Sequence, residues 1–226
     1  MKNYTLKSFL LVLLLGTSIL LVSCNDDPSD GRITFGVITT SNNTGNVGGR
    51  VAAANDLVFT SGTITIREVV FDGDNEAQSI SRTIAQVADV NYATGAVTPE
   101  ISFTVPPGNY TSVNLGIEMQ DVGSSPSTVI EGTFTNSNLE EIPIRFEFNS
   151  GEVFEASAAS VAIEAGANII GKVTFDALDW FSTVTASELE NATLTDGTIV
   201  ISESSNSAIF EKVAARLDVA TQAVFE

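Results

Sequence analysis

Residue types able to do chemistry are scarce, because the chain has one cysteine, Cys24, and no histidine. Ser-His-Asp and Cys-His catalysis, zinc sites built from Cys and His, and disulfides within the chain are therefore excluded. Carboxylates, Lys, Tyr and oxygen-bound cations remain, together with modification of the single thiol. The polar neighbours Ser23 and Asn25 cannot enclose a buried thiol, so modification is the better explanation for Cys24.

A short apolar segment precedes this cysteine. Lys2 and Lys7 are positive, and residues 9–22 are apolar apart from one short interruption, which is the order of a secretory signal peptide. Fourteen residues would form a helix of roughly 21 Å, shorter than the roughly 30 Å hydrocarbon core of a bilayer. The sequence therefore predicts a cleaved signal at residues 1–23 rather than a transmembrane helix.

The junction Leu21-Val22-Ser23-Cys24 resembles the lipobox of bacterial lipoproteins, in which a leucine lies three residues before the cysteine and a small residue directly before it. The resemblance covers residues 1–24. It implies that the Cys24 thiol carries lipid, that the chain is cut before Cys24 and that the new N-terminus is acylated. Two or three acyl chains would anchor the protein to a membrane almost permanently.

An acidic stretch follows the cysteine. Residues 24–31, which include Asp26, Asp27 and Asp30, are predicted to be the lipidated cysteine and a solvated tether. The acidic cluster also looks like the signal that sends lipoproteins of the Bacteroidota to the outer face of the outer membrane. The alternative is a plain acidic spacer, which leaves the periplasmic face open.

Oxygen ligands for a cation are grouped in "FDGDNEA". Asp72, Asp74 and Glu76 are the calcium candidates, although their spacing does not complete the EF-hand pattern. The alternative is a hairpin turn, which Asp and Asn favour. No cofactor is predicted, and calcium remains a minor hypothesis.

Two aromatic residues are candidates for ligand binding. Trp180, the single Trp, and Tyr110 could stack on a sugar ring if they were exposed, whereas aromatic side chains at such places more often fill the core. With 28 acidic residues, some carboxylate pair satisfies any loose catalytic spacing, so acid pairs give no sign of an enzyme. We expect a protein that is not an enzyme.

Charge limits the partners. Removing residues 1–23 takes two of the ten basic residues and none of the 28 acidic ones, which leaves eight against 28, a formal charge of −20. This charge argues against nucleic acid as a partner of the folded part and fits a domain held away from an anionic surface. The expected membrane contact is through the lipid anchor, and the protein or glycan partner is left open.

The elements after residue 31 are mainly β. Apolar and polar residues alternate in about nine segments separated by Gly, Asn, Asp and Pro. A phase shift near Glu68 suits a bulge, and residues 142–148 with 152–156 are predicted to form a hairpin. Residues 39–49 are predicted to be a mobile loop. An antiparallel two-layer β-sandwich over residues 32–226 is the predicted fold.

The pattern changes after Phe175. Thr185 and Glu188 have capping-box spacing, which predicts a short helix to about Ala192. A second helix is predicted from an apolar stripe that includes Ile209, Phe210 and Val213. The fold class is therefore mainly β, with one or two short helices near the C-terminus.

Segments such as "PPGNYTSVNLGIEM" and "IPIRFEFNSGEVFE" resemble the β-sandwich domains of Bacteroidota envelope lipoproteins, families with no agreed activity. The resemblance implies an outer-membrane lipoprotein, facing the cell exterior, that serves as a binding or structural module of the envelope. One alternative is a fimbrillin-like adhesin subunit, for which Arg50 is the candidate protease site. Another is a carbohydrate-binding accessory protein of a glycan-uptake system.

Overall fold

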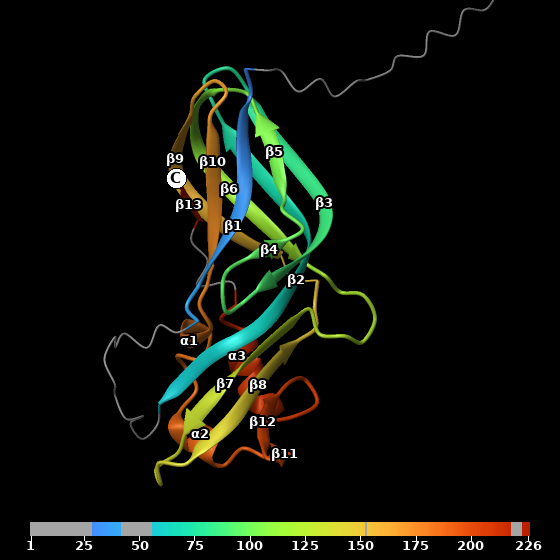
Figure 1. The fold of residues 1–226 in the computed structure, drawn as a ribbon, viewed down its shortest axis with the longest axis vertical. Helices are drawn as coiled ribbons and strands as arrows, with labels where there is room; N and C mark the ends of the chain where they lie inside the picture. Colours follow the sequence, from blue (N-terminus) through green and yellow to red (C-terminus); the bar gives the residue numbers. More distant parts are fainter. Residues whose placement is uncertain (1–28, 42–55, 152, 218–222) are drawn as a thin grey trace, which may run out of the picture.

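The computed structural model describes residues 29–41, 56–151, 153–217 and 223–226. These residues form two β-sheets and three short helices (Figure 1), so the fold is mainly β, as predicted. Cys24, the signal segment, Arg50 and most of the predicted loop at residues 39–49 lie outside the described residues.

The smaller sheet has four strands, with β1 and β10 at its centre. Their pairing is parallel, from Arg32 opposite Asn168 to Thr39 opposite Phe175. The two outer strands run antiparallel to their neighbours. In spatial order the strands are β13 (Ala223–Phe225), β10 (Asn168–Phe175), β1 (Gly31–Thr39) and β5 (Ser102–Val105).

The larger sheet is organised around one long strand, β2 (Leu57–Asp74). One edge of β2 pairs with β3 (Ser79–Asn91), and the other edge pairs first with β7 (Thr128–Thr135) and then with β6 (Gly108–Met119). Further strands extend this sheet: β4 (Val97–Thr98) beside β3, β9 (Val153–Ile163) beside β6, and β8 (Glu141–Phe148), β12 (Thr198–Ile201) and β11 (Leu194–Thr195) beyond β7.

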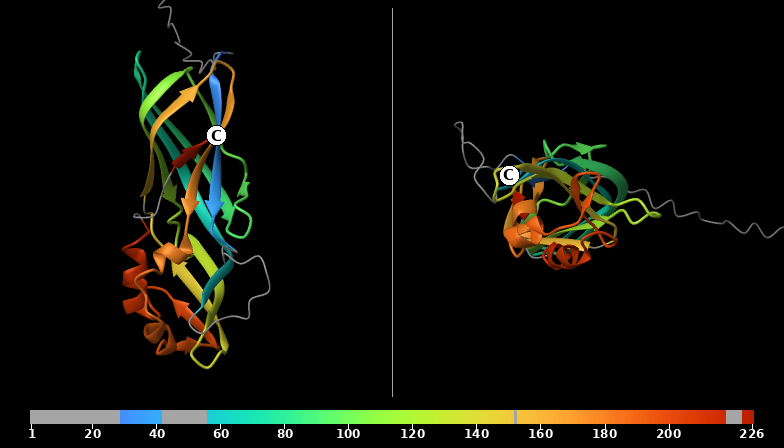
Figure 2. Two further views of the ribbon diagram at one scale, coloured as in Figure 1. Left: turned by 90° about the vertical axis from the view of Figure 1, so that its left-hand side faces the viewer. Right: turned by 90° about the horizontal axis from the view of Figure 1, so that it is seen from below.

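Different elements pack over the two ends of β2. In the upper half of Figure 1 the four-stranded sheet lies over β9, β6, β2 and β3, which makes a sandwich. In the lower half the helices lie against β2, β7, β8 and β12, and Figure 2 shows the same division from the side. The helices are α1 (Ala177–Trp180), α2 (Ala186–Glu190) and α3 (Ser207–Ala214). One hydrophobic cluster continues through both halves.

Two bulges keep β2 facing this core along its whole length. Its buried residues change from odd to even positions between Phe59 and Ile64, and back to odd positions between Ile66 and Val69. The register shifts between Phe59 and Ser61 against β7, and between Ile66 and Glu68 against β3 and β6. An extra residue in one strand reverses which face the following side chains occupy. The bulge predicted near Glu68 is therefore confirmed.

The backbones of β2 and β7 approach closely at the lower bulge. A Cβ at Gly132 would lie 1.9 Å from the carbonyl oxygen of Val58, so only glycine fits at this place.

The predicted hairpin of residues 142–148 with 152–156 is wrong. Strand β8 pairs with β7 and β12, whereas β9 pairs with β6 in the sandwich half. The connection that includes residues 149–151 therefore leads from one half to the other. Turn residues show that a chain changes direction, but they do not fix which strand becomes the partner.

The predicted helices are present, and a third one was not predicted. Thr185 and Glu188 form the capping box of α2 through both of its hydrogen bonds. Helix α3 buries Ile209, Phe210 and Val213, as its apolar stripe indicated. The additional helix, α1, is one turn long and is capped by Asp176, whose side chain accepts a hydrogen bond from the Asp179 backbone N–H.

Candidate functional site

The described chain begins at the sandwich end of the molecule. The Ser29 carbonyl oxygen accepts a hydrogen bond from the Gly166 N–H at 3.0 Å, and Gly31 at the start of β1 pairs with Val105 of β5. Figure 1 shows this start at the opposite end of the long axis from α2 and β11. The segment that would carry the lipid on Cys24 therefore joins the sandwich end, although Cys24 itself lies outside the described residues.

The calcium candidates lie on the β2–β3 hairpin. Asp72 and Asp74 are on β2, and Glu76 is in the turn. The Asn75 side-chain oxygen accepts hydrogen bonds from the N–H groups of Ala77 and Gln78, both at 2.9 Å, which closes the turn. Within the described ranges no three Asp or Glu side chains are grouped so that they could hold a metal ion. The alternative interpretation, a turn stabilised by Asn, accounts for this segment.

The two aromatic candidates are core side chains. Tyr110 is fully buried, and its hydroxyl donates to the Pro106 carbonyl oxygen at 2.6 Å. Burial raises the pKa of this tyrosine above its ordinary value. Trp180 is 2 % exposed and meets Phe175 edge to face, with ring centroids 6.1 Å apart. Stacking on a sugar needs an open ring face, so neither residue can serve as the proposed ligand platform.

A part-buried polar contact, which was not predicted from the sequence, joins the two halves. Thr40, just after β1, lies 3.1 Å from the Tyr92 hydroxyl and donates to the Asp176 carboxylate at 3.0 Å. Asp176 also caps α1, so one carboxylate links β1 and the first helix. Burial raises the pKa of Tyr92. Because each of these polar groups has a hydrogen-bond partner, we interpret the contact as structural. Its residues lie too far apart in the sequence to be recognised as a group.

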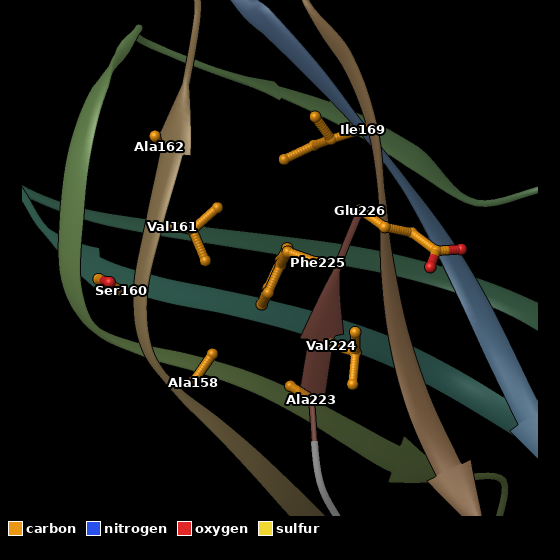
Figure 3. Close-up of a pocket in the computed structure, with 9 residues that line it drawn as sticks. All are labelled: Ala158, Ser160, Val161, Ala162, Ile169, Ala223, Val224, Phe225 and Glu226. Carbon is orange, nitrogen blue, oxygen red and sulfur yellow. The ribbon is translucent and has the colours of Figure 1, made fainter.

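One hollow of the sandwich half lies between β9 and β13 (Figure 3). Its volume is about 430 Å³. Figure 3 shows Val161, Ile169, Phe225 and Val224 around the opening, with the Glu226 carboxylate at one side. Glu226 is its one ionisable lining side chain, so this pocket offers apolar contact and a sheet edge but no acid-base pair.

A second pocket, of about 340 Å³, lies at the other side of the sandwich, where β3 meets β5. Its lining includes Arg32 and Arg82 and no carboxylate. Neither arginine was recognised as a site residue from the sequence, because they are 50 residues apart and belong to different sheets.

The third hollow lies at the helix-covered end, beside α2 and α3, and its volume is about 450 Å³. Its charged lining group, Glu188, is paired with Lys212 at 2.5 Å. The hydrogen bonds from Lys212 and then from Thr185 hold the pKa of Glu188 at about 2. Asn206, also in the lining, bonds to Thr193 and Val200 and so fastens the start of α3. These side chains are engaged in stabilising the fold.

Comparison of the chain with known protein families, with curated proteins and with solved structures finds no match. Among the helices of the described residues, none has the length and apolar character needed to cross a bilayer.

Proposed function

We propose that this chain is a lipoprotein of the outer membrane, anchored through Cys24 and exposed at the cell surface, where it serves as a binding or structural module without enzymatic activity. The observation that carries the proposal is the end of the fold at which the described chain begins. Strand β1 begins seven residues after Cys24, at the sandwich end. Seven extended residues reach at most about 25 Å, so the anchor would hold the sandwich end close to the membrane.

The same geometry would present the helix-covered end outward. Helix α2, the β7–β8 turn and the β11–β12 hairpin lie at the end of the long axis away from β1's start (Figure 1). A formal charge of −20 on the mature chain adds repulsion from an anionic membrane surface, which favours an upright, extended position. The distal end is therefore the surface where we expect partners to bind.

The pockets support a role other than catalysis. A carboxylate pair, or a nucleophile beside a base, is the minimum for hydrolysis by the residue types available here. Each of the pockets described between β9 and β13, between β3 and β5, and beside α2 brings in one carboxylate at most. The carbohydrate-binding alternative loses both of its aromatic candidates, because the Trp180 and Tyr110 rings are buried. Arg50, the candidate protease site of the adhesin alternative, lies outside the described residues.

The test combines labelling with protease access in a host of the Bacteroidota. Wild-type protein should incorporate radioactive palmitate, lose residues 1–23 and be digested by proteinase K added to intact cells. Cys24→Ala should incorporate no label and remain uncleaved or leave the membrane fraction, with unchanged thermal stability of the folded part. A Cys24→Ala chain that is processed and membrane-bound like the wild type, with neither chain labelled, would refute the lipoprotein proposal. Protection from the protease would refute surface exposure alone.

A further inference from the structure

The pocket between β3 and β5 differs from the rest of the molecule in charge. Six of the seven basic side chains that the structure describes form salt bridges with carboxylates: Arg32, Arg67, Arg145, Lys172, Lys212 and Arg216. Arg82, the seventh, has no such partner in the described part of the chain. A guanidinium without a carboxylate is unexpected in a chain with 28 acidic residues.

Arg82 is held in place by the backbone instead. Its Nε donates to the Thr104 carbonyl oxygen of β5 at 3.4 Å, and its Nη1 donates to the Ser81 carbonyl oxygen at 3.3 Å. A guanidinium has five N–H donors, so the two on Nη2 and one on Nη1 are left without a partner among the described residues. Arg82 is exposed, and these two long bonds orient its guanidinium toward β5 with the remaining donors open to solvent.

Arg32 supplies a second positive charge to the same pocket. Its Nη2 lies 2.9 Å from the Glu100 carboxylate, and the two side chains are 50 % and 63 % exposed. A salt bridge this exposed contributes little and can open at little cost when an anion enters the pocket. Two guanidinium groups from different sheets therefore line one hollow.

The pocket also has an apolar wall. Phe103 and Ile84 are half-buried lining residues, and the Phe103 ring packs on Phe71 with centroids 5.7 Å apart. A volume of about 340 Å³ is at the lower end of the range for small-molecule sites, roughly 300 to 1,000 Å³. Cationic donors beside a half-exposed aromatic wall suit a ligand with one anionic end and one apolar end.

We propose that the β3–β5 pocket binds a small organic oxyanion, a carboxylate or phosphate joined to a short apolar group, through Arg82 and Arg32. The net negative charge of the chain does not prevent this binding. Carboxylates farther than about 8 Å are screened at physiological ionic strength, whereas charge-assisted hydrogen bonds from a guanidinium act at contact distance. The proposal does not depend on lipidation of Cys24.

The test is calorimetric titration of the full mature chain, in nanodiscs of zwitterionic phosphatidylcholine, with phenyl phosphate in buffer of about 0.15 M ionic strength. We expect a dissociation constant of roughly 1 mM or tighter and no heat with the neutral analogue benzyl alcohol. Arg82→Gln should weaken phenyl phosphate about tenfold or more, since it removes a charged donor group. Arg82→Lys keeps the charge but not the planar fork, so its dissociation constant should lie between those of the wild type and Arg82→Gln.

The matched control is Arg67→Gln. Arg67 lies on β2 in salt bridges with Glu118 and Asp121, away from the pocket, and its replacement changes the net charge equally. Phenyl phosphate should bind this variant within about twofold of the wild type, because distant charges are screened. Absence of binding to the wild type, or equal weakening by Arg67→Gln and Arg82→Gln, would overturn the proposal.

A second arm distinguishes a lipid headgroup from a soluble ligand. The titration is repeated in nanodiscs that contain phosphatidylglycerol. If the wild type binds phenyl phosphate more weakly in these discs than in zwitterionic discs, and Arg82→Gln binds it equally in both, the proposal is supported with a lipid phosphate as the source. Unchanged binding would support it with a soluble oxyanion as the source.

Discussion

Two clusters of aromatic rings lie along β2, one in each half of the molecule, and they are built differently. The upper cluster is centred on Phe71, and its partners come from strands of both sheets: Phe103, Tyr110 and Phe225, with ring centroids 5.7, 5.7 and 6.3 Å away. The lower cluster is centred on Phe146, and its partners are Phe148 on the same strand and Phe181 and Phe210 from the helical segment, at 6.4, 5.8 and 6.1 Å.

The difference shows that one strand can support two kinds of cover. Strand β2 brings Phe71 to the upper cluster and Phe59, whose ring centroid is 4.9 Å from that of Phe181, to the lower cluster. The two bulges keep both side chains on the buried face. What lies over that face comes from other segments of the chain: the strands β1, β5, β10 and β13 over the upper half, and the helices α1, α2 and α3 over the lower half. The element that packs over each half is therefore set by the periodicity of those segments and not by β2.

The largest expected effect comes from emptying either cluster. Phe71→Ala and Phe146→Ala each remove a fully buried ring with three ring neighbours, so each should lower the free energy of unfolding by about 3 to 5 kcal/mol. Urea unfolding followed by far-UV circular dichroism measures this change.

The same pair tests whether the two halves unfold together. Because β2 and one hydrophobic cluster run through both halves, we expect a single transition in each variant. Fluorescence of Trp180, the single Trp, should follow the same curve as circular dichroism. If Phe146→Ala loses the fluorescence change at lower urea than the ellipticity, the halves are separable and the shared core does not couple them.

Much of the fold was predictable because its signal is local. The alternation that predicts mainly β structure, the capping box of α2 and the apolar stripe of α3 are all patterns of neighbouring residues. Pairing was not predictable in the same way. Both β8 and β9 show the expected alternation. Strand β8 nevertheless pairs with β7 and β12, and β9 pairs with β6, because pairing is decided by burial across the whole sheet.

The candidate site was less accessible from the sequence. Trp180 and Tyr110 attracted notice by residue type, and their burial could only be decided by packing. Arg82 looks like any surface arginine in "SISRTIAQ", since its distinctive property is that no carboxylate of the described residues pairs with it, which depends on chain segments far away in sequence. Residue type signals chemistry, whereas an unpaired charge is visible only in three dimensions.

A smaller effect, confined to the lower half, is expected at Asn206. This residue has φ +51° and makes three hydrogen bonds, to Thr193 N, Thr193 O and Val200 O, at 2.8, 3.0 and 2.7 Å. Asn206→Ala should cost about 2 to 3 kcal/mol, from the lost bonds and the left-handed backbone. Asn206→Gly should cost about 1 kcal/mol less, since glycine accepts that φ. Equal losses by urea unfolding would show that the backbone conformation is not a factor.

Removing the helix cap should have a still smaller effect. Thr185→Ala deletes the side-chain acceptor for the Glu188 N–H at 3.3 Å and should lower the free energy of unfolding by about 1 kcal/mol. Thr185→Ser keeps the acceptor and serves as the control, with a loss of less than about half that amount. A Ser variant as unstable as the Ala variant would point to packing of the Thr methyl group instead of the cap.

The smallest expected effect is a pH-dependent loss of stability at the Glu188–Lys212 pair, which lies in the lower half. The hydrogen bond from Lys212, followed by those from Thr185, lowers the pKa of Glu188 from 4.5 to about 2 in the folded chain. Because the folded-state pKa is depressed, the pair stabilises the fold fully above about pH 4.5, and this contribution is lost as the pH falls toward 2. The stability difference between wild type and Glu188→Gln should therefore be constant near neutral pH and shrink between pH 4.5 and 2.

The control is Glu211→Gln, which removes an exposed carboxylate of α3 that has no salt bridge in the described residues. Lys212→Gln should reduce the same pH-dependent difference, since it removes the main cause of the shift. A difference that persists unchanged down to pH 2, measured by urea unfolding at each pH, would show that Glu188 acts through packing and not through its charge.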